Sequence, residues 1–398
     1  MNKELEKFII EHEGCDPYAV ALEKDRYPGI DISLAAKCIA ARSIIRKKVP
    51  SWYSFPSLVY PSMTSIEQCS SEATARYKQR FMEGCRKMAD ITGGMGVDTY
   101  FLSLKASDAD YYEKDRTLCE AARHNFHELG INNINVINEN ISVTNIQSIK
   151  TGYYDFIYID PSRRDMHGKR VYSIKDCSPD ISVLVPELRK CCGRILVKIS
   201  PMEDISEILR TVSGITEIHT TGYGSECKEM LLLVGSGESG GCMLTAYDID
   251  CGTGISFTLS EEKSAATEFG YPEPGCFLYE PSPAILKAGA FKTVANTYGI
   301  AKIAVNTHLY VSDRRMDNFP GKTYRIIECR RFNKRNAADL RKKYGKASVT
   351  ARNFPLGSAG LKKLLDTAES DTLHIFGTTA QNGERLLVAC EVIRRALP

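Results

Sequence analysis

Hydrophobic positions recur with a helical period through most of the first 85 residues. Between Leu34 and Ile45 the apolar residues are spaced three and four apart, and Asp31 or Ser33 can cap the start of that helix. A connector rich in proline and aromatic residues follows, and Ser70–Lys78 then has the pattern of another capped helix. These patterns predict an N-terminal helical domain over residues 1–85.

From residue 86 to residue 238 the pattern changes to apolar runs separated by helical segments. In one such segment, Leu118 to Leu129, apolar residues are spaced four, four and three apart, and Gly130 then marks a helix end. Strands that alternate with helices favour a mostly parallel sheet with right-handed crossovers. The predicted strands of this α/β domain are 87–91, 109–113, 134–137, 154–159, 194–199 and 229–234.

A glycine- and serine-rich segment, 235–241, separates the α/β domain from the remainder of the chain. The remainder predicts two small α+β units, the first over 239–315 and the second over 316–398. Within the first unit, the segment 279–291 predicts a helix that opens on prolines. The predicted strands of the second unit are 323–328, 348–351, 373–376 and 386–392.

The positive charge of the chain is concentrated in the last of these units. The whole sequence has a formal net charge of only +3, yet Arg314 to Lys363 contains 15 Lys or Arg and 3 Asp or Glu. Aromatic residues are interleaved with this charge, which is typical of a nucleic-acid-binding surface. The alternative interpretation is a solvated charged face.

Composition excludes several other classes of protein. No run of about 18 apolar residues predicts a membrane span, and the polar, acidic N-terminus does not resemble a secretory signal. The 14 cysteines are scattered, and Cys191 and Cys192 are adjacent, so no zinc-ligand spacing is present. We therefore expect a cytoplasmic protein with reduced cysteines and no metal.

A glycine cluster follows the first strand of the α/β domain. Asp90 is followed by Gly93, Gly94 and Gly96, where glycine lets the backbone turn sharply and approach a ligand closely. Glu113 ends the next strand, 23 residues after Asp90, where its carboxylate can accept hydrogen bonds from ribose hydroxyls. The spacing predicts a nucleotide-binding sheet with its ligand at the carboxyl ends of the strands. The full dinucleotide motif is incomplete because its third glycine is absent.

A second candidate site follows the strand 154–159. Asp160-Pro161 lies at the carboxyl end of this buried strand, the edge at which open α/β sheets place their substrates. Arg163 and Arg164 make the adjoining loop basic, so that it can contact phosphates or stack on a base. The alternatives are a simple strand-ending turn and an exposed loop with salt bridges.

Taken together, these motifs resemble class I S-adenosylmethionine (SAM)-dependent methyltransferases. More narrowly, the chain resembles the bacterial RNA methyltransferases with a C-terminal THUMP-like domain. The segments that carry the resemblance are 68–78, 90–102, 122–126, 158–165, 279–291 and 306–310. The resemblance implies a Rossmann-like methyltransferase sheet, a ferredoxin-like unit near 240–315 and an RNA-capturing THUMP-like unit after it.

The resemblance also implies roles for individual residues. Asp90, Gly94 and Gly96 would surround the methionine part of SAM, Glu113 would hold the ribose, and Asn140, expected to end the third strand, would meet the adenine. The predicted cofactor-binding set is completed by Thr92, Gly93 and Asp98.

The predicted catalytic residues are Asp160, Pro161 and Arg163. A carboxylate at position 160 can accept N–H bonds from a base amine, and similarity to cap guanine-N2 methyltransferases favours an amine target. Two departures stand against a full transfer of roles. Ser162 and Arg163 replace the second proline and the aromatic of amine methyltransferases, which removes the usual stacking partner of a flipped base. The turn after the next strand, Lys198–Pro201, lacks the cysteine that carbon-5 methylation needs.

The sequence thus predicts a methyltransferase that acts on structured RNA, tRNA or rRNA, with SAM as cofactor. One alternative is a catalytically silent protein that binds SAM and RNA, and another is a methyltransferase for a protein or a small molecule. A nicotinamide-dependent oxidoreductase is the most distant of the alternatives.

Overall fold

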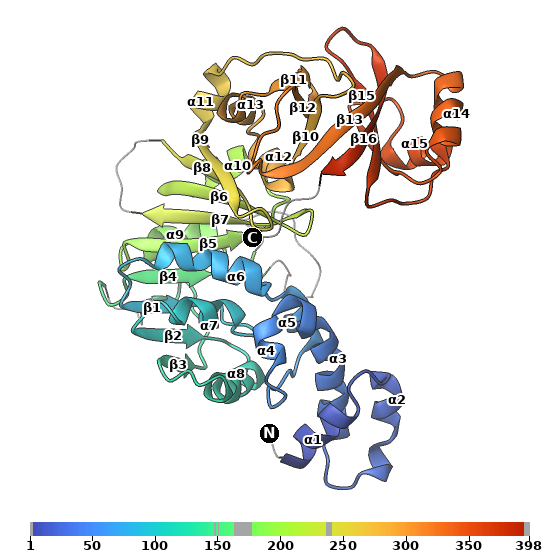
Figure 1. Ribbon diagram of the computed structural model, residues 1–398. Coiled ribbons are helices and arrows are strands. Elements are labelled where there is room, and N and C mark those ends of the chain that lie inside the picture. Colours follow the sequence, from blue (N-terminus) through green and yellow to red (C-terminus); the bar gives the residue numbers. More distant parts are fainter. Residues whose placement is uncertain (1–2, 147–148, 150, 163–176, 236–240, 394–398) are drawn as a thin grey trace. The chain divides into compact units, whose positions relative to one another are not determined.

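A computed structural model describes residues 3–146, 149, 151–162, 177–235 and 241–393 (Figure 1). The chain divides into two compact units, of which the first comprises 1–217 with 230–240 and the second 218–229 with 241–398. None of the described helices has both the length and the apolar character needed to cross a membrane. The predicted domain boundaries after residues 85, 238 and 315 stay predictions.

The first unit begins with helices, as predicted. Their bounds are α1 (Lys3–Glu11), α2 (Pro17–Leu22), η1 (Lys24–Arg26), α3 (Ile32–Lys48), α4 (Pro50–Tyr53), α5 (Met63–Gln68), α6 (Glu72–Lys78) and η2 (Gln79–Met82). Of the two caps considered for α3, Asp31 is the one observed, because its Oδ1 accepts from the amide of Leu34 at 3.0 Å. Ser71 caps α6 in the same way, through the amide of Thr74.

The core of these helices extends to two helices of the α/β domain. Trp52 is fully buried and meets Tyr100 of α7 (Val97–Ser103) edge to face, with ring centroids 5.6 Å apart. Asn125 of α8 (Arg116–Glu128) holds the connector by bonding both the amide and the carbonyl of Val59, at 2.8 and 2.9 Å. The N-terminal helices therefore share one hydrophobic core with α7 and α8.

The α/β sheet has nine strands in the order β3-β2-β1-β4-β5-β7-β6-β8-β9. Their bounds are β1 (Lys87–Asp90), β2 (Asp108–Tyr112), β3 (Ile134–Ile137), β4 (Phe156–Ile159), β5 (Arg194–Ile199), β6 (Ile215–Tyr223), β7 (Glu226–Gly235), β8 (Met243–Asp248) and β9 (Thr253–Thr258). Strands β1 to β5 are parallel, and β7 runs antiparallel to β5. The strand order reverses between β1 and β4, which confirms the Rossmann-like class and creates a switch point.

Each of the six predicted strands of this domain is present, but β6 was missed. Its sequence places His219, Thr220 and Thr221 in consecutive buried positions. An apolar-run criterion overlooks such a strand because burial there is carried by polar side chains. The helices α9 (Ile181–Leu188) and α10 (Ile205–Thr211) complete the crossovers of the first unit.

The second unit contains a seven-stranded sheet in the order β11-β12-β10-β13-β16-β15-β14. Its strands are β10 (Phe277–Pro281), β11 (Ala301–Ala304), β12 (Thr307–Ser312), β13 (Gly321–Arg331), β14 (Ser348–Arg352), β15 (Leu373–Thr379) and β16 (Arg385–Ile393). Its helices are α11 (Leu259–Ser264), α12 (Pro283–Ala288), α13 (Thr293–Tyr298), α14 (Lys334–Lys343) and α15 (Ser358–Leu365).

The helix predicted over 279–291 is shorter than expected. Tyr279 to Pro281 belongs to β10, and α12 begins only at Pro283, because proline is favoured at the first position of a helix. The four strands predicted after residue 316 are all present as β13 to β16.

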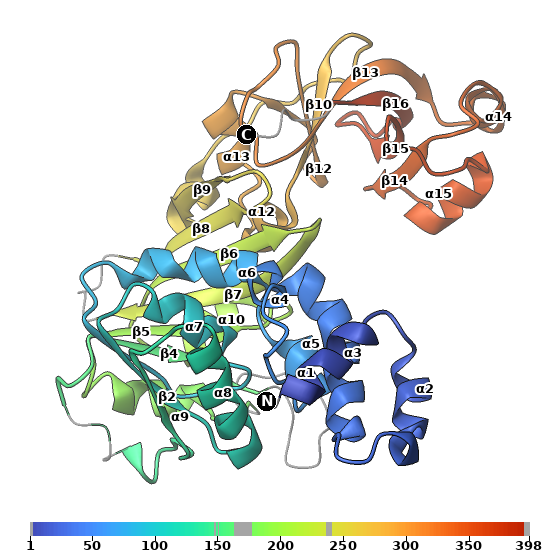
Figure 2. The ribbon, with the colours of Figure 1, turned by 60° about the horizontal axis from the view of Figure 1, so that its bottom comes forward.

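Helices α14 and α15 lie side by side against the end of this sheet (Figure 2). Leu340 and Leu361 are buried between them and the strands. The approach of α15 is close, since a Cβ at Gly377 of β15 would lie 2.5 Å from the Leu361 side chain and 3.0 Å from the Phe354 ring. A glycine in the strand is thus required by packing rather than by backbone conformation.

We expect Gly377→Ala to lower the free energy of unfolding by about 1–3 kcal/mol, because the added methyl group overpacks this contact. Urea unfolding followed by circular dichroism measures the change. Gly345→Ala is the matched control, since a Cβ at position 345 meets nothing within 4 Å. Equal stability of the two variants would show that α15 can move away from the sheet at little cost.

Candidate functional site

The switch point is organised by the carboxylate of Asp90 at the end of β1. Its Oδ1 accepts from the amide and the hydroxyl of Thr92, at 2.9 and 3.2 Å, and its Oδ2 accepts from the hydroxyl of Thr99 at 2.6 Å. The Thr92 hydroxyl oxygen in turn accepts from the amide of Asp160 at 2.7 Å. The loops that follow β1 and β4 are therefore tied together by one threonine.

The glycines of the turn serve different purposes. A Cβ at Gly93 would lie 2.3 Å from the ring of Tyr111, and one at Gly96 would lie 2.7 Å from Phe126, so both positions are closed by packing. Gly94 has a φ of +58°, which favours glycine, and a Cβ there would meet only a backbone oxygen at 3.8 Å. Gly94 is accordingly the position at which the backbone is open to a ligand.

Glu113 directly follows β2 and is held against this turn. Its Oε2 accepts from the amide of Gly94 and its Oε1 from the amide of Asp115, each at 2.8 Å. Asn138 supports the same segment by donating from Nδ2 to the Glu113 carbonyl at 2.8 Å. The carboxylate expected to bind a ribose is thus fixed by two backbone amides.

Asp160, the residue after β4, forms an ion pair with Lys198 of β5. The Nζ of Lys198 lies 2.6 Å from Oδ2 of Asp160, and their side chains are 15% and 33% exposed. The pair is therefore partly exposed at the carboxyl ends of β4 and β5, where Asp160 can meet a substrate. Pro161 is buried beside it.

A buried polar cluster connects this pair to the N-terminal helices. Lys78 of α6 is fully buried and lies 3.1 Å from Oδ1 of Asp98, at the start of α7. Oδ2 of Asp98 accepts from the hydroxyls of Ser70 and Tyr158, at 2.7 and 2.8 Å. The Ser70 oxygen accepts from Lys78 at 3.2 Å and from Lys198 at 3.3 Å, so it joins both lysines.

The pKa values of the two buried acids, Asp90 and Asp98, are shifted in opposite directions. Burial raises the pKa of Asp90 to about 7, although the hydrogen bonds from Thr99 and Thr92 oppose this rise. Burial also acts against the charged form of Asp98, but the attraction of Lys78 and Lys198 prevails and keeps the pKa of Asp98 below its ordinary value. Asp98 is therefore a permanent counter-ion of the lysines.

Most of the predicted residues are brought together here, with two exceptions. Asn140 is exposed in the loop beyond β3, which ends at Ile137, and its carbonyl accepts from Asn145. Asn138 is the asparagine that contacts the Glu113 segment. Arg163 and the neighbouring Arg164 lie outside the described residues.

Three contributors were not identified as site residues: Ser70, Lys78 and Tyr158. Lys198 was considered only as the start of the turn that lacks a cysteine. A lysine between apolar positions of an amphipathic helix is the one sequence signal that could have indicated Lys78, since an unpaired lysine is almost never fully buried. His124 lies apart from this cluster, and its Nε2 bonds the Ser57 carbonyl at 2.9 Å.

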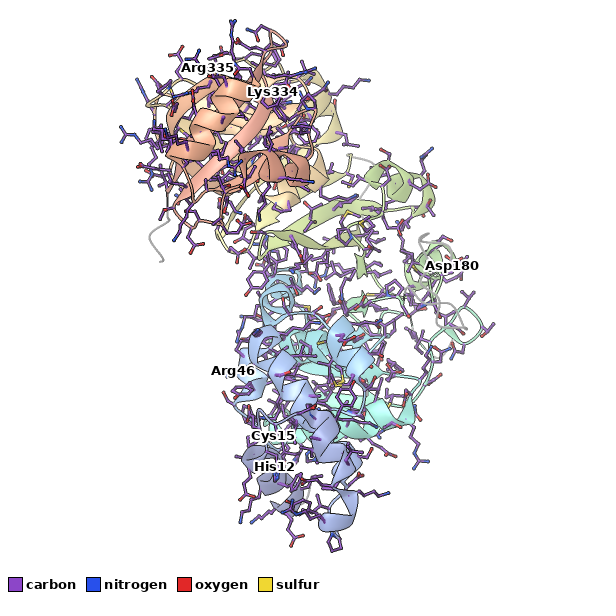
Figure 3. The ribbon with its side chains drawn as sticks, turned by 90° about the vertical axis from the view of Figure 1, so that its right-hand side faces the viewer. His12, Cys15, Arg46, Asp180, Lys334 and Arg335 are labelled. Carbon is purple, nitrogen blue, oxygen red and sulfur yellow. The ribbon has the colours of Figure 1, made fainter. Side chains whose placement is uncertain are left out.

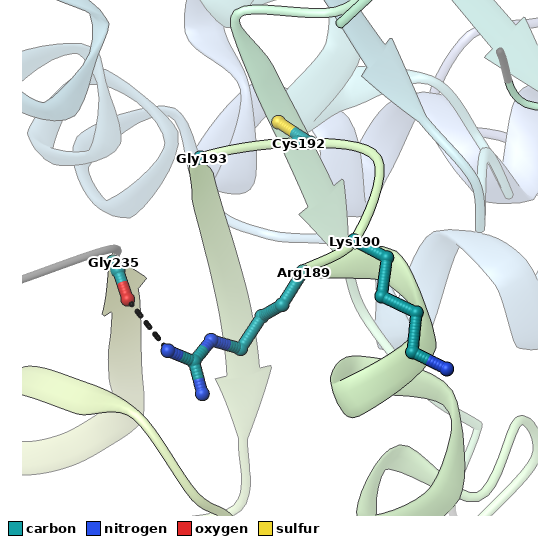
Figure 4. A pocket seen from close by; sticks show the side chains of 5 residues that line it. All are labelled: Arg189, Lys190, Cys192, Gly193 and Gly235. Atoms are coloured by element: carbon teal, nitrogen blue, oxygen red, sulfur yellow. Dashed lines mark hydrogen bonds between the residues drawn. The ribbon is translucent and has the colours of Figure 1, made fainter. Parts of the chain in front are cut away.

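One other feature of the first unit lies apart from this site. A small surface hollow lined by Arg189, Lys190, Cys192, Gly193 and Gly235 adjoins the start of β5 and the end of β7 (Figure 4). It is at the opposite end of β5 from Lys198. Among the described residues, no group of three or more His, Cys, Asp or Glu side chains is arranged to hold a metal ion.

Comparison with protein families assigns the second unit. The model of a ferredoxin-like domain matches residues 277–320, and the model of a THUMP domain-like family matches residues 321–392. No curated protein sequence matches the chain.

Solved structures provide a full-length relative. The crystal structure of a putative methyltransferase from Porphyromonas gingivalis W83 is 33% identical, with a TM-score of 0.87, over 98% of each chain. SMU.1697c from Streptococcus mutans, solved in complex with SAH, is 12% identical over 40% of this chain and 95% of its own, with a TM-score of 0.31. An rRNA methylase from Streptococcus thermophilus is 15% identical over 41% of this chain and 93% of its own, with a TM-score of 0.29.

The two streptococcal scores are too low to support a conclusion about this chain. The first relative is sufficient by itself, because its identity extends over nearly the whole of both sequences. The chain therefore belongs to the family of that Porphyromonas protein, the methyltransferases that carry ferredoxin-like and THUMP-like domains.

Proposed function

We propose that this protein is a SAM-dependent methyltransferase that modifies a nucleotide of structured RNA, either tRNA or rRNA. The observation that carries the proposal is the arrangement at the switch point. Three features lie there at the ends of neighbouring strands: a glycine turn, the fixed carboxylate of Glu113 and the Asp160–Lys198 pair. The chain that carries them belongs to a methyltransferase family.

The glycine turn fits SAM as its cofactor. Gly94 leaves the backbone open to close approach, and Glu113 presents a carboxylate at the end of β2 that can hold the ribose hydroxyls. Asp90 and Asp98 are buried and bonded inside the protein, whereas Glu113 is only half-buried, so we assign the two aspartates to shaping the turn rather than to direct contact. Asn140, exposed beyond β3, stays a predicted contact to the adenine.

Bound SAM supplies a methyl group on a positively charged sulfur, which is a good leaving group. The protein must therefore mainly orient the acceptor and exclude water. We assign the orientation to Asp160: with Oδ2 held by Lys198, an N–H of a base amine would donate to Oδ1 and leave its proton there after transfer. Pro161 stiffens the following backbone, and Arg163 stays a predicted contact to the substrate.

The second unit supplies a surface for RNA. Lys334, Arg335 and Lys342 are exposed on α14, and the first two are labelled in Figure 3. These three have no ion-pair partner within the described part of the chain, whereas Arg341 on the same helix pairs with Asp366. Cations without a protein partner can neutralise phosphates and release their counterions. A THUMP-like domain with this surface supports RNA as the substrate.

We expect Glu113→Ala to raise the Kd for SAM by about 10- to 100-fold, since charge-assisted hydrogen bonds contribute about 1.5–3 kcal/mol each. Isothermal titration calorimetry with SAM measures the change. Glu120→Ala on α8 is the control, because Glu120 is exposed and pairs with Arg116 at the surface. An unchanged Kd in Glu113→Ala would remove Glu113 from the cofactor site.

Asp160→Ala should reduce methyl transfer by at least about 100-fold and change the Kd for SAM by less than about threefold, because Asp160 acts on the acceptor. Transfer is measured with tritiated SAM on total RNA from a strain that lacks the gene. Asp160→Asn tests the charge separately while preserving the shape. Full turnover in both variants would place the acceptor elsewhere.

Reversal of the α14 charges by Lys334→Glu, Arg335→Glu and Lys342→Glu should weaken RNA binding. It should also make the slope of log Kd against log salt less steep, by the amount expected for the loss of about three phosphate contacts. Fluorescence anisotropy with labelled tRNA, at several salt concentrations, measures both effects.

The control for these reversals is an equal change of charge in the first unit, at the exposed residues Lys37, Lys47 and Lys105. Equal losses in the two triple variants would mean that net charge alone governs binding. That outcome would exclude α14 as a specific surface for RNA.

A further inference from the structure

The hydroxyl of Ser70 is the meeting point of the buried cluster. It donates to Oδ2 of Asp98 at 2.7 Å, and its oxygen accepts from Nζ of Lys78 at 3.2 Å and from Nζ of Lys198 at 3.3 Å. A hydroxyl has one donor and two acceptor positions, so these three contacts use its full capacity. Its orientation is thereby fixed, which is unusual for a rotatable group.

The charges around Ser70 explain why the cluster can be buried. Lys78 is fully buried and Asp98 is 9% exposed, and such ions are tolerated only when they are paired and hydrogen-bonded. Asp98 neutralises Lys78, while Asp160 neutralises Lys198. Ser70 is the neutral group between the two ion pairs, and it separates the two ammonium groups.

Lys198 needs such a group to be held in place. A lysine ammonium sits on a flexible stem of four carbons, so a single contact to Asp160 would leave Nζ free to swing around the carboxylate. The contact to Ser70 gives Nζ a further fixed point beside the one on Oδ2 of Asp160, which Nζ reaches at 2.6 Å. Both Ser70 and Lys78 come from the N-terminal helical segment, which is distant in sequence from Lys198.

We propose that Ser70 and Lys78 are positioning residues for methyl transfer. They place Lys198 on Oδ2 of Asp160, so that Oδ1 is directed toward the acceptor. The inference rests on the proposed function, since it assigns an acceptor-orienting role to Asp160. Its consequence is that the N-terminal helical segment forms part of the catalytic apparatus through these two side chains, in addition to covering the sheet.

The first test observes the Lys198 ammonium group directly. Hydrogen-bonded, shielded ammonium protons exchange slowly with water, so the full-length protein labelled with 15N-lysine should give a Lys198 signal in an NH3+-selective spectrum, assigned by its loss in Lys198→Met. Ser70→Ala should shift or broaden this signal. Ser71→Ala is the matched control, because it removes the neighbouring hydroxyl, which caps α6 and bonds no lysine among the described residues.

The second test measures transfer of tritiated methyl groups to total RNA. Ser70→Ala should lower kcat by about 10-fold with little change in the Kd for SAM, while Ser71→Ala should stay within about twofold of wild type. In the Lys198→Met background, Ser70→Ala should cause less than about a twofold further loss, because its effect passes through Lys198.

The two tests fail in distinguishable ways. An unchanged Lys198 signal in Ser70→Ala, or a full 10-fold further loss in the Lys198→Met background, overturns the positioning role of Ser70. The spectrum needs no turnover, so it still decides the placement of Lys198 if wild-type protein methylates no RNA, an outcome that would refute the proposed function instead. The double variant Lys78→Met/Asp98→Asn removes both buried charges and extends the test to Lys78. An unchanged Lys198 signal in this double variant would exclude a positioning role for Lys78.

Discussion

The ion pair of Lys78 and Asp98 is the interaction on which the rest of the first unit depends. It joins α6 to the start of α7, immediately after the glycine turn, and Tyr158 of β4 bonds the same carboxylate. Removing one member of such a pair leaves an uncompensated buried charge, at a cost of about 3–5 kcal/mol. Any arrangement of the helices, the turn and the central strand that separates Lys78 from Asp98 is therefore disfavoured.

Much of the α/β sheet was predictable because its central strands are apolar on both faces. Strands β4 and β5 have this character, and each predicted run became a strand. The missed strand β6 shows where the criterion fails, because His219 and Thr221 are buried without being apolar. Their burial depends on neighbours contributed by other parts of the chain, which a local pattern does not contain.

In the candidate site, too, local sequence patterns indicate some residues, whereas tertiary contacts bring in the others. The places of Asp90, Gly94, Glu113 and Asp160 after strand ends were predictable, because each has a set position relative to a strand; their roles stay predictions. Ser70 and Lys78 lie on a segment whose local pattern indicates only a capped helix. Their role arises from tertiary contacts with Asp98 and Lys198. Asn140 was expected to end the third strand, but β3 ends at Ile137 and Asn138 is the asparagine that supports the Glu113 segment.

Positive charge serves two different purposes in the two units. In the first unit Lys78 and Lys198 are paired with carboxylates and held by a hydroxyl, so their charge fixes geometry and is largely neutralised. On α14, Lys334 and Arg335 are exposed and have no ion-pair partner among the described residues, so their charge remains available to an anionic partner. Net charge alone conceals this division, because the +3 of the whole chain is the sum of a basic surface and a more acidic remainder. The distribution of pairing, rather than the number of basic residues, is therefore what distinguishes a surface for RNA from a positioning device within the site.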